Sequence, residues 1–163
     1  MKESAHSQWM KAALREAEKA FDAGETPVGC VIVHGNKIIG RGYNMIETLT
    51  DSTAHAEMQA LTSAFDSLDT KQLKGCSMYV TLEPCSMCAG AIVLAKIDNL
   101  YFGAYDLKAG ACGSVINITN NKSLNHRCRV YGGILDVECG GILKAFFDMK
   151  RKKGKMPKGF SNN

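Results

Sequence analysis

The sequence predicts an α/β fold in which helices flank a mixed five-stranded sheet, and two observations support it. Residues 28–33 form an apolar run, and His34-Gly35-Asn36 separates it from residues 37–44, as in an antiparallel hairpin. Residues 77–103 read as strand, helix and strand, which implies a parallel crossover. A chain of 163 residues can bury an ordinary core. We therefore expect one domain over residues 1–155 and a basic, disordered tail over residues 156–163.

Residues 7–44 supply one helix and the hairpin. Residues 7–23 repeat apolar side chains at helical spacing, and Gly24 is a stop signal. Trp9 in this helix is expected in the core. His34 falls in the hairpin turn and is expected to be solvated.

Residues 54–152 supply three strands and three helices. We expect helices over residues 54–65, 85–95 and 135–152, and strands over 77–81, 99–103 and 129–134. Residues 104–113 read as a loop, and residues 117–125 as irregular. Gly140-Gly141 inside the last helix costs about 1 kcal/mol per glycine relative to alanine. Close packing against another backbone would explain this pair.

Three residues form a candidate metal site: His55, Cys85 and Cys88. Two cysteines three apart in the first turn of a helix face the same way, and Pro84 suits a helix start. One imidazole and two thiolates are ligands that select zinc. Catalytic zinc sites keep three protein ligands, whereas structural sites usually close with four. One of the five other cysteines as a fourth ligand is the alternative.

Glu57 follows His55 by two residues and is the candidate catalytic residue. Water on a zinc ion of this kind ionises near pH ~7 instead of ~15.7, and Glu57 would carry its proton to the substrate. Positions i and i+2 of a helix point roughly 200° apart. His55 must therefore sit at the very start of its helix, with Asp51, Ser52 or Thr53 as the N-cap.

Composition and charge narrow the class of protein. The first residues lack the apolar core of a signal peptide, and the longest apolar run, residues 87–95, is too short to span a membrane. We therefore expect a cytoplasmic protein whose non-ligand cysteines (Cys30, Cys76, Cys112, Cys128 and Cys139) are reduced and mostly buried.

Basic residues gather at the C-terminal end. From Lys144 onward there are seven basic residues and one acid, Asp148, whereas the rest of the chain is nearly neutral. Such a distribution is typical of contact with a polyanion, although a solvated terminus has the same composition.

H-x-E followed by P-C-x-x-C is the signature of zinc-dependent deaminases. Further stretches, TPVGCVIVHGNKIIGRGYN, STAHAEMQAL and MYVTLEPCSMCAGAIVLAKIDNLYFGAYDLKAGACGS, extend the likeness over nearly the whole chain. The sequence resembles the bacterial-type tRNA-specific adenosine deaminases of the cytidine/deoxycytidylate deaminase superfamily. The resemblance implies a three-layer α/β/α cytidine-deaminase-like fold and one zinc ion per subunit. It also implies a homodimer that converts adenosine to inosine at the wobble position of the tRNA anticodon stem-loop.

The resemblance also assigns substrate contacts. It implies that the side chain of Asn44 and backbone groups of Ala56 and Glu83 hold the base edge, while Val28 packs on its face. Asp106 and Lys108 would contact neighbouring nucleotides, and Phe147 would stack on one. Without the resemblance, Asn44 could simply close a turn. His126 is expected to be a structural histidine.

Two other functions remain open. The zinc motif also fits a deaminase of a free nucleobase or nucleoside, such as guanine or cytosine. The third alternative is a noncatalytic RNA-binding subunit whose zinc ion is structural. Glu57 argues against it, because a structural site has no use for an acid beside an open ligand position. Cysteines at 30, 112 and 139 and Tyr105 depart from the expected pattern, which leaves the details of loop contact open.

Overall fold

The computed structural model describes residues 3–154 and contains one five-stranded sheet. Its strands are β1 (Gly29–His34), β2 (Lys37–Tyr43), β3 (Ser77–Leu82), β4 (Asn99–Ala104) and β5 (Arg129–Tyr131). They lie in the order β2-β1-β3-β4-β5. Strand β1 is antiparallel to β2 and β3, whereas β3, β4 and β5 run parallel. The mixed sheet is therefore confirmed, and the tail over 156–163 lies outside the described residues.

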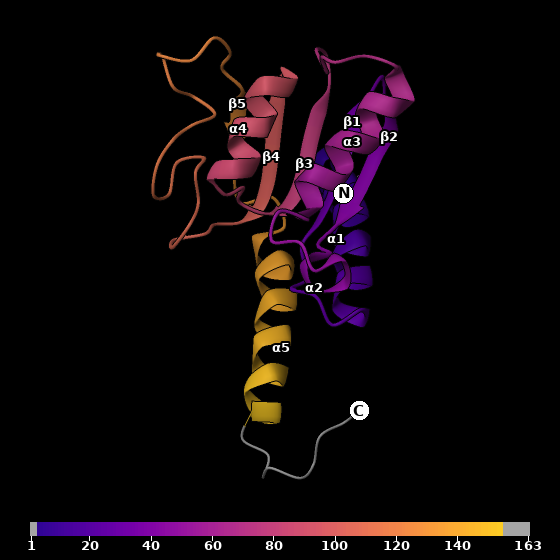
Figure 1. The fold of residues 1–163 in the computed structure, drawn as a ribbon, viewed down its shortest axis with the longest axis vertical. Coiled ribbons are helices and arrows are strands. Elements are labelled where there is room, and N and C mark those ends of the chain that lie inside the picture. Colours follow the sequence, from indigo (N-terminus) through magenta and orange to yellow (C-terminus); the bar gives the residue numbers. More distant parts are fainter. Residues whose placement is uncertain (1–2, 155–163) are drawn as a thin grey trace.

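Five helices complete the described fold: α1 (Ala5–Asp22), α2 (Ile46–Leu49), α3 (Ala56–Leu68), α4 (Ser86–Ala95) and α5 (Asp136–Gly154). Helices α3 and α4 cover one face of the sheet and α1 covers the other, giving three layers (Figure 1). Helix α5 starts at the sheet and extends beyond its edge. None of the described helices is long and apolar enough to cross a membrane.

The close packing of α3 on β2 depends on two glycines. A Cβ at Gly40 would lie 2.4 Å from the carbonyl oxygen of Ala60, and one at Gly42 would lie 2.3 Å from that of Ala56. Neither backbone oxygen can move without disturbing the helix, so only glycine fits. This contact fixes the height of the first turn of α3 above the sheet, and that turn carries Glu57.

Several predicted boundaries were wrong at the C-terminal side. The last strand ends at Tyr131 instead of residue 134, and α5 starts at Asp136 after Leu135, which has a positive φ of 54°. The close packing expected at Gly140-Gly141 is also wrong, because a Cβ at either position would meet no atom within 4 Å. Helix α2, with only four residues, is too short to show a periodic pattern and was missed.

Residues without a proposed role in chemistry behave as expected. All seven cysteines are free, and the five outside the candidate metal site are buried. His34 is exposed at its turn, and Trp9 packs against a core cluster. The Nε2 atom of His126 lies 2.6 Å from the carbonyl oxygen of Ile97, which confirms a structural histidine.

Candidate active site

The three side chains of the candidate metal site come from the starts of two helices. His55 is the N-cap of α3 and Cys85 is the N-cap of α4, both with extended backbone, and Cys88 follows in the first turn of α4. Both helix N-termini therefore face the same point, and their dipoles favour thiolate over thiol. The expected N-caps at residues 51–53 were wrong, since Asp51 instead accepts hydrogen bonds from the N–H and hydroxyl of Thr53.

Pro84 does not begin the helix, because α4 starts at Ser86 and the proline precedes the N-cap. Its carbonyl oxygen accepts a hydrogen bond of 2.9 Å from the N–H of Ala111. The proline thus joins the metal-binding turn to the loop that follows β4.

The donor atoms lie close enough to share one ion. The Nδ1 atom of His55 lies 3.6 Å from Sγ of Cys85 and 3.5 Å from Sγ of Cys88, and all three donors fall within 4.8 Å of one another. Among the described residues, this is the one group of three or more potential ligands close enough to hold a metal ion. One imidazole nitrogen and two sulfurs at this spacing fit a tetrahedral zinc site with one open position.

The ionisation of the two thiols also fits a metal site. Hydrogen bonds from Cys88 and His55 lower the pKa of the Cys85 thiol to about 3. The contact with Cys85 raises the pKa of Cys88, because Cys88 supplies the proton that the Cys85 thiolate accepts. The contact with Cys85 likewise raises the pKa of His55. The sulfur and nitrogen atoms of these three residues thus share protons with one another, and a bound cation would replace those protons.

Glu57 lies beside this group and is 4 % exposed. It occupies the first turn of α3, and the extended backbone at His55 allows both side chains to reach one site despite their i, i+2 spacing. Burial raises the pKa of the Glu57 carboxyl, although contacts with its own backbone N–H, Cys88 and His55 oppose that effect. A raised pKa makes the carboxylate a better proton acceptor, and the acid that forms can return the proton to a substrate.

A cavity of about 230 Å³ opens next to these side chains. It brings together eight of the residues that the sequence singled out: Val28, Asn44, His55, Ala56, Glu57, Glu83, Cys85 and Asp106. The Nδ2 atom of Asn44 donates a 3.2 Å hydrogen bond to the carbonyl oxygen of Thr26. Its Oδ1 atom is buried without a partner, which leaves an acceptor for a ligand group.

Two candidate contacts lie outside the cavity lining. Lys108 is exposed on the loop after β4, and Phe147 is 44 % exposed on α5. Sequence reasoning missed four lining residues: Thr26, Ile46, Leu82 and Ala109. Ile46 belongs to the unpredicted helix α2, and nothing in its sequence context distinguishes it from a core residue.

Comparisons with known proteins agree with this geometry. Residues 4–151 match the model of the MafB19-like deaminase family. The tRNA-specific adenosine deaminase of Bacillus subtilis is 47 % identical over 147 residues, which cover 90 % of this chain and 91 % of the relative. The enzyme of the same name from Aquifex aeolicus is 47 % identical over 143 residues, covering 88 % of this chain and 94 % of the relative.

A solved structure from a study of A-to-I editing by tRNA:A34 deaminases at the wobble position of transfer RNA superimposes with a TM-score of 0.80. It is 40 % identical and covers 83 % of this chain and 99 % of its own. Both the sequence and the three-layer architecture are thus shared along most of the chain. The chain therefore belongs to the family of tRNA-specific adenosine deaminases.

Proposed function

We propose that this protein is a zinc-dependent enzyme that hydrolytically deaminates adenosine to inosine at the wobble position of tRNA anticodons. The observation that carries the proposal is the buried Glu57 carboxyl beside a three-donor metal group, at the wall of a cavity. A purely structural metal site has no use for such an acid.

His55, Cys85 and Cys88 would hold the zinc ion. When bound, zinc supplies Lewis-acid activation of water for attack on the base. The two sulfurs offset the charge of the ion, and the helix N-termini favour their thiolate form.

Glu57 would move the protons of the reaction. It accepts a proton from the attacking water and delivers it to N1 of the adenine ring. It then takes the proton of the new C6 hydroxyl and delivers it to the leaving amine. Water adds at C6, the C6–N6 bond breaks, and the products are inosine and ammonia. Burial keeps bulk water away from this transfer.

Residues of the cavity wall would orient the base. Asn44 offers its unpartnered Oδ1 and backbone groups of Ala56 and Glu83 line the same space, while Val28 supplies an apolar surface. The base must leave its loop to enter, which costs least in single-stranded RNA.

Turnover of a minimal anticodon stem-loop compared with free adenosine tests the proposal. We expect inosine from the stem-loop at a far higher kcat/KM. Preference for a free nucleoside or base would instead support the free-nucleobase class of deaminase. With tRNA as its substrate, the protein would act in the cytoplasm.

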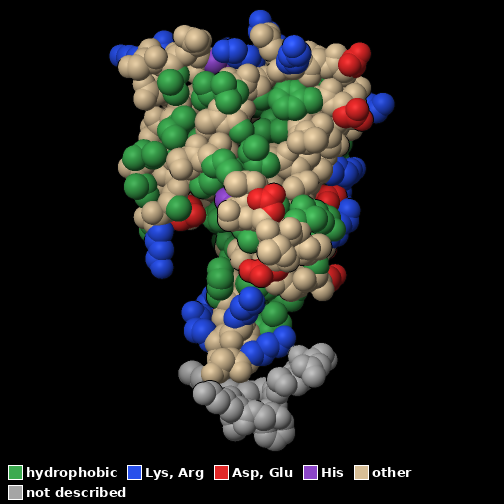
Figure 2. Space-filling view, viewed as in Figure 1, with side chains coloured by type: hydrophobic (Ala, Val, Ile, Leu, Met, Phe, Trp, Pro, Cys, Tyr) green, Lys and Arg blue, Asp and Glu red, His purple; other side chains and the backbone are tan. Residues whose placement is uncertain are grey.

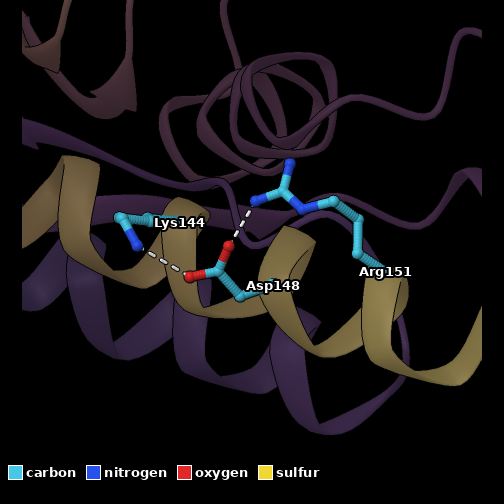
Figure 3. Close-up of polar contacts among 3 residues, drawn as sticks. All are labelled: Lys144, Asp148 and Arg151. Atoms are coloured by element: carbon cyan, nitrogen blue, oxygen red, sulfur yellow. Dashed lines mark hydrogen bonds and ion pairs between the residues drawn. The ribbon is translucent and has the colours of Figure 1, made fainter. Parts of the chain in front are cut away.

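Helix α5 would bind the RNA backbone. Figure 2 shows Lys and Arg side chains around the part of this helix that extends beyond the sheet. Asp148 bonds to both Lys144 and Arg151 and holds the two cations on one side of the helix (Figure 3). Phe147 is exposed beside them, whereas Phe146 packs edge-on against Phe21. Phosphate contacts and a base-stacking ring would thus lie on one helix.

Deleting the residues after Met149 should raise KM for tRNA and flatten its salt dependence. The deletion removes most of the basic residues of the C-terminal end. Each lost phosphate contact on single-stranded RNA should lower the log–log salt slope by about 0.7. Steady-state kinetics from low to physiological salt measure this, and an unchanged slope would mean that the tail is only solvated.

The apolar face of α3 and α4 would join two copies of the chain. Helix α4 carries no charged residue, and its Leu94 is 80 % exposed. A groove of about 500 Å³, lined mainly by apolar residues, runs between the two helices, and Figure 2 shows hydrophobic side chains over this area. Lys71 is the one charged residue among those that line the groove, so little like-charge repulsion opposes the packing of this face on its own copy. We therefore propose a homodimer.

Leu94→Glu should convert this homodimer to monomer. Burying an unpaired carboxylate costs about 2 kcal/mol or more, so the dimer dissociation constant should rise at least about thirtyfold. Sedimentation equilibrium measures it. Val137→Glu is the matched control, because Val137 is 78 % exposed on α5 and should leave the mass unchanged. A Leu94→Glu protein with the wild-type mass would contradict this interface.

A further inference from the structure

Two segments far apart in the sequence contribute to the wall of the candidate active site. Ile46 of α2 lines the cavity, and so do Asp106 and Ala109 of the loop after β4. Neither segment is held by strand pairing. Each instead donates several hydrogen bonds to one buried glutamate, whose carboxylate has no part in the proposed proton transfer, and the loop after β4 is also bonded to Pro84 through the N–H of Ala111.

Glu83 holds the wall formed by residues 106–114. Its side chain is 2 % exposed and accepts hydrogen bonds from the N–H groups of Asp106 at 3.2 Å, Cys112 at 3.2 Å and Ser114 at 3.1 Å. The hydroxyl of Ser114 donates a fourth bond of 2.5 Å. The loop also wraps closely around the carboxylate, since a Cβ at Gly110 would lie 2.3 Å from its Oε2.

The same loop has internal order that depends on this anchor. The Oδ1 atom of Asp106 accepts bonds from the N–H groups of Lys108 and Ala109, both at 3.0 Å. The same residue, Asp106, donates its N–H to Glu83, so the Glu83 carboxylate fixes the residue from which the turn starts. Because Glu83 lies two residues before Cys85, the position of the turn is tied to the candidate metal group.

Glu25 binds the other segment, helix α2. It is 1 % exposed and accepts bonds of 2.8 Å from the N–H of Glu47, the N–H of Thr48 and the hydroxyl of Thr48. These groups belong to the first turn of α2, where a carboxylate also meets the helix dipole. Among the described residues, neither Glu25 nor Glu83 forms an ion pair. Both charges are therefore held mainly by N–H and O–H donors.

We propose that Glu25 and Glu83 are positioning residues that fix the two walls, and that Glu83 thereby determines which nucleotides are accepted beside the target base. This inference rests on the proposed function. A carboxylate has only acceptors, so both of its oxygens can serve backbone donors. In Glu83→Gln, the amide NH2 group replaces one of the two oxygens and faces backbone N–H donors. Turning the amide over only moves this clash to the other set of donors.

Amide hydrogen exchange tests the anchors without any reference to catalysis. Glu83→Gln should speed exchange at Asp106, Cys112 and Ser114 and leave Glu47 and Thr48 unchanged. Glu25→Gln should do the reverse, so each variant is the matched control of the other. Loss of one charge-assisted bond should raise the exchange rate about tenfold or more. Wild-type rates at these amides in both variants would overturn the inference.

Kinetics on stem-loops with altered flanking nucleotides test the consequence. Glu83→Gln should raise KM for the cognate loop about tenfold, reduce the discrimination among flanking nucleotides, and change kcat by less than about threefold. A merely structural role would lower activity on every loop by the same factor. Ser114→Ala removes one of the four bonds and should give a smaller effect in the same direction. If Glu83→Gln does not fold, the same kinetic comparison is made with Ser114→Ala.

The outcomes separate the inference from the function on which it rests. A wild-type protein that converts the stem-loop, with Glu83→Gln and Ser114→Ala showing unchanged discrimination, would overturn the inference alone. A wild-type protein that does not convert the stem-loop would overturn the proposed function and the substrate part of the inference with it.

Discussion

Glu57→Gln is expected to lose inosine formation while it keeps its fold and its metal. Glutamine fills the same buried volume but cannot accept the proton of the attacking water. General acid–base groups contribute about 10²–10⁴-fold, so kcat on an anticodon stem-loop should fall by at least about 10²-fold. Single-turnover measurements of inosine and metal analysis of the same sample give the two readouts. Glu57→Ala should behave in the same way.

Glu18→Gln is the matched control for this experiment. Glu18 is exposed on α1 and does not line the cavity, so its replacement should leave activity at the wild-type level. Retained activity in Glu57→Gln with full metal content would refute the acid–base role of Glu57.

Cys85→Ser is expected to lose the metal, and with it both activity and part of the thermal stability. Replacing a thiolate by a weakly acidic hydroxyl removes one of three donors, whose sulfur lies 3.6 Å from the imidazole of His55. A ligand at 1,000 times its Kd stabilises a fold by about 4 kcal/mol, so the metal-dependent part of the unfolding free energy should shrink by that order. Zinc content and thermal unfolding with and without a chelator measure both effects.

Cys30→Ala separates ligand loss from the general effect of removing a buried sulfur. Cys30 is fully buried and lies outside the three-donor group. This variant should bind zinc like the wild type, with a stability change of only about 1 kcal/mol. A Cys85→Ser protein with full zinc content and an unchanged response to the chelator would contradict the assignment of Cys85.

Local patterns in the sequence predicted most of the fold. Alternation and turn residues gave the hairpin of β1 and β2, and the apolar runs around α4 gave the parallel pair of β3 and β4. The i, i+3 spacing of Cys85 and Cys88 placed both sulfurs on one side of a helix start. These predictions succeeded because each depends on residues within one or two turns of the chain.

Predictions that needed distant partners failed or were absent. The caps of α3 and α4 turned out to be His55 and Cys85 themselves, two residues whose side chains make no capping hydrogen bond and which cap-residue preferences therefore do not indicate. The glycine pair of α5 packs against nothing among the described residues, although the sequence suggested a close contact. Helix α2 has no periodicity and is held by Glu25, 23 residues before Thr48.

The sequence by itself determined the chemistry: one imidazole, two thiols and one carboxyl in spacings that bring them to helix starts. Only the tertiary structure decided the shape of the space beside them. Glu25 and Glu83 look like ordinary acidic residues in the sequence, because the N–H groups that they bind lie more than 20 residues away. A buried carboxylate takes its role from the donors that the fold brings to it, and that set of donors is a property of the packed chain.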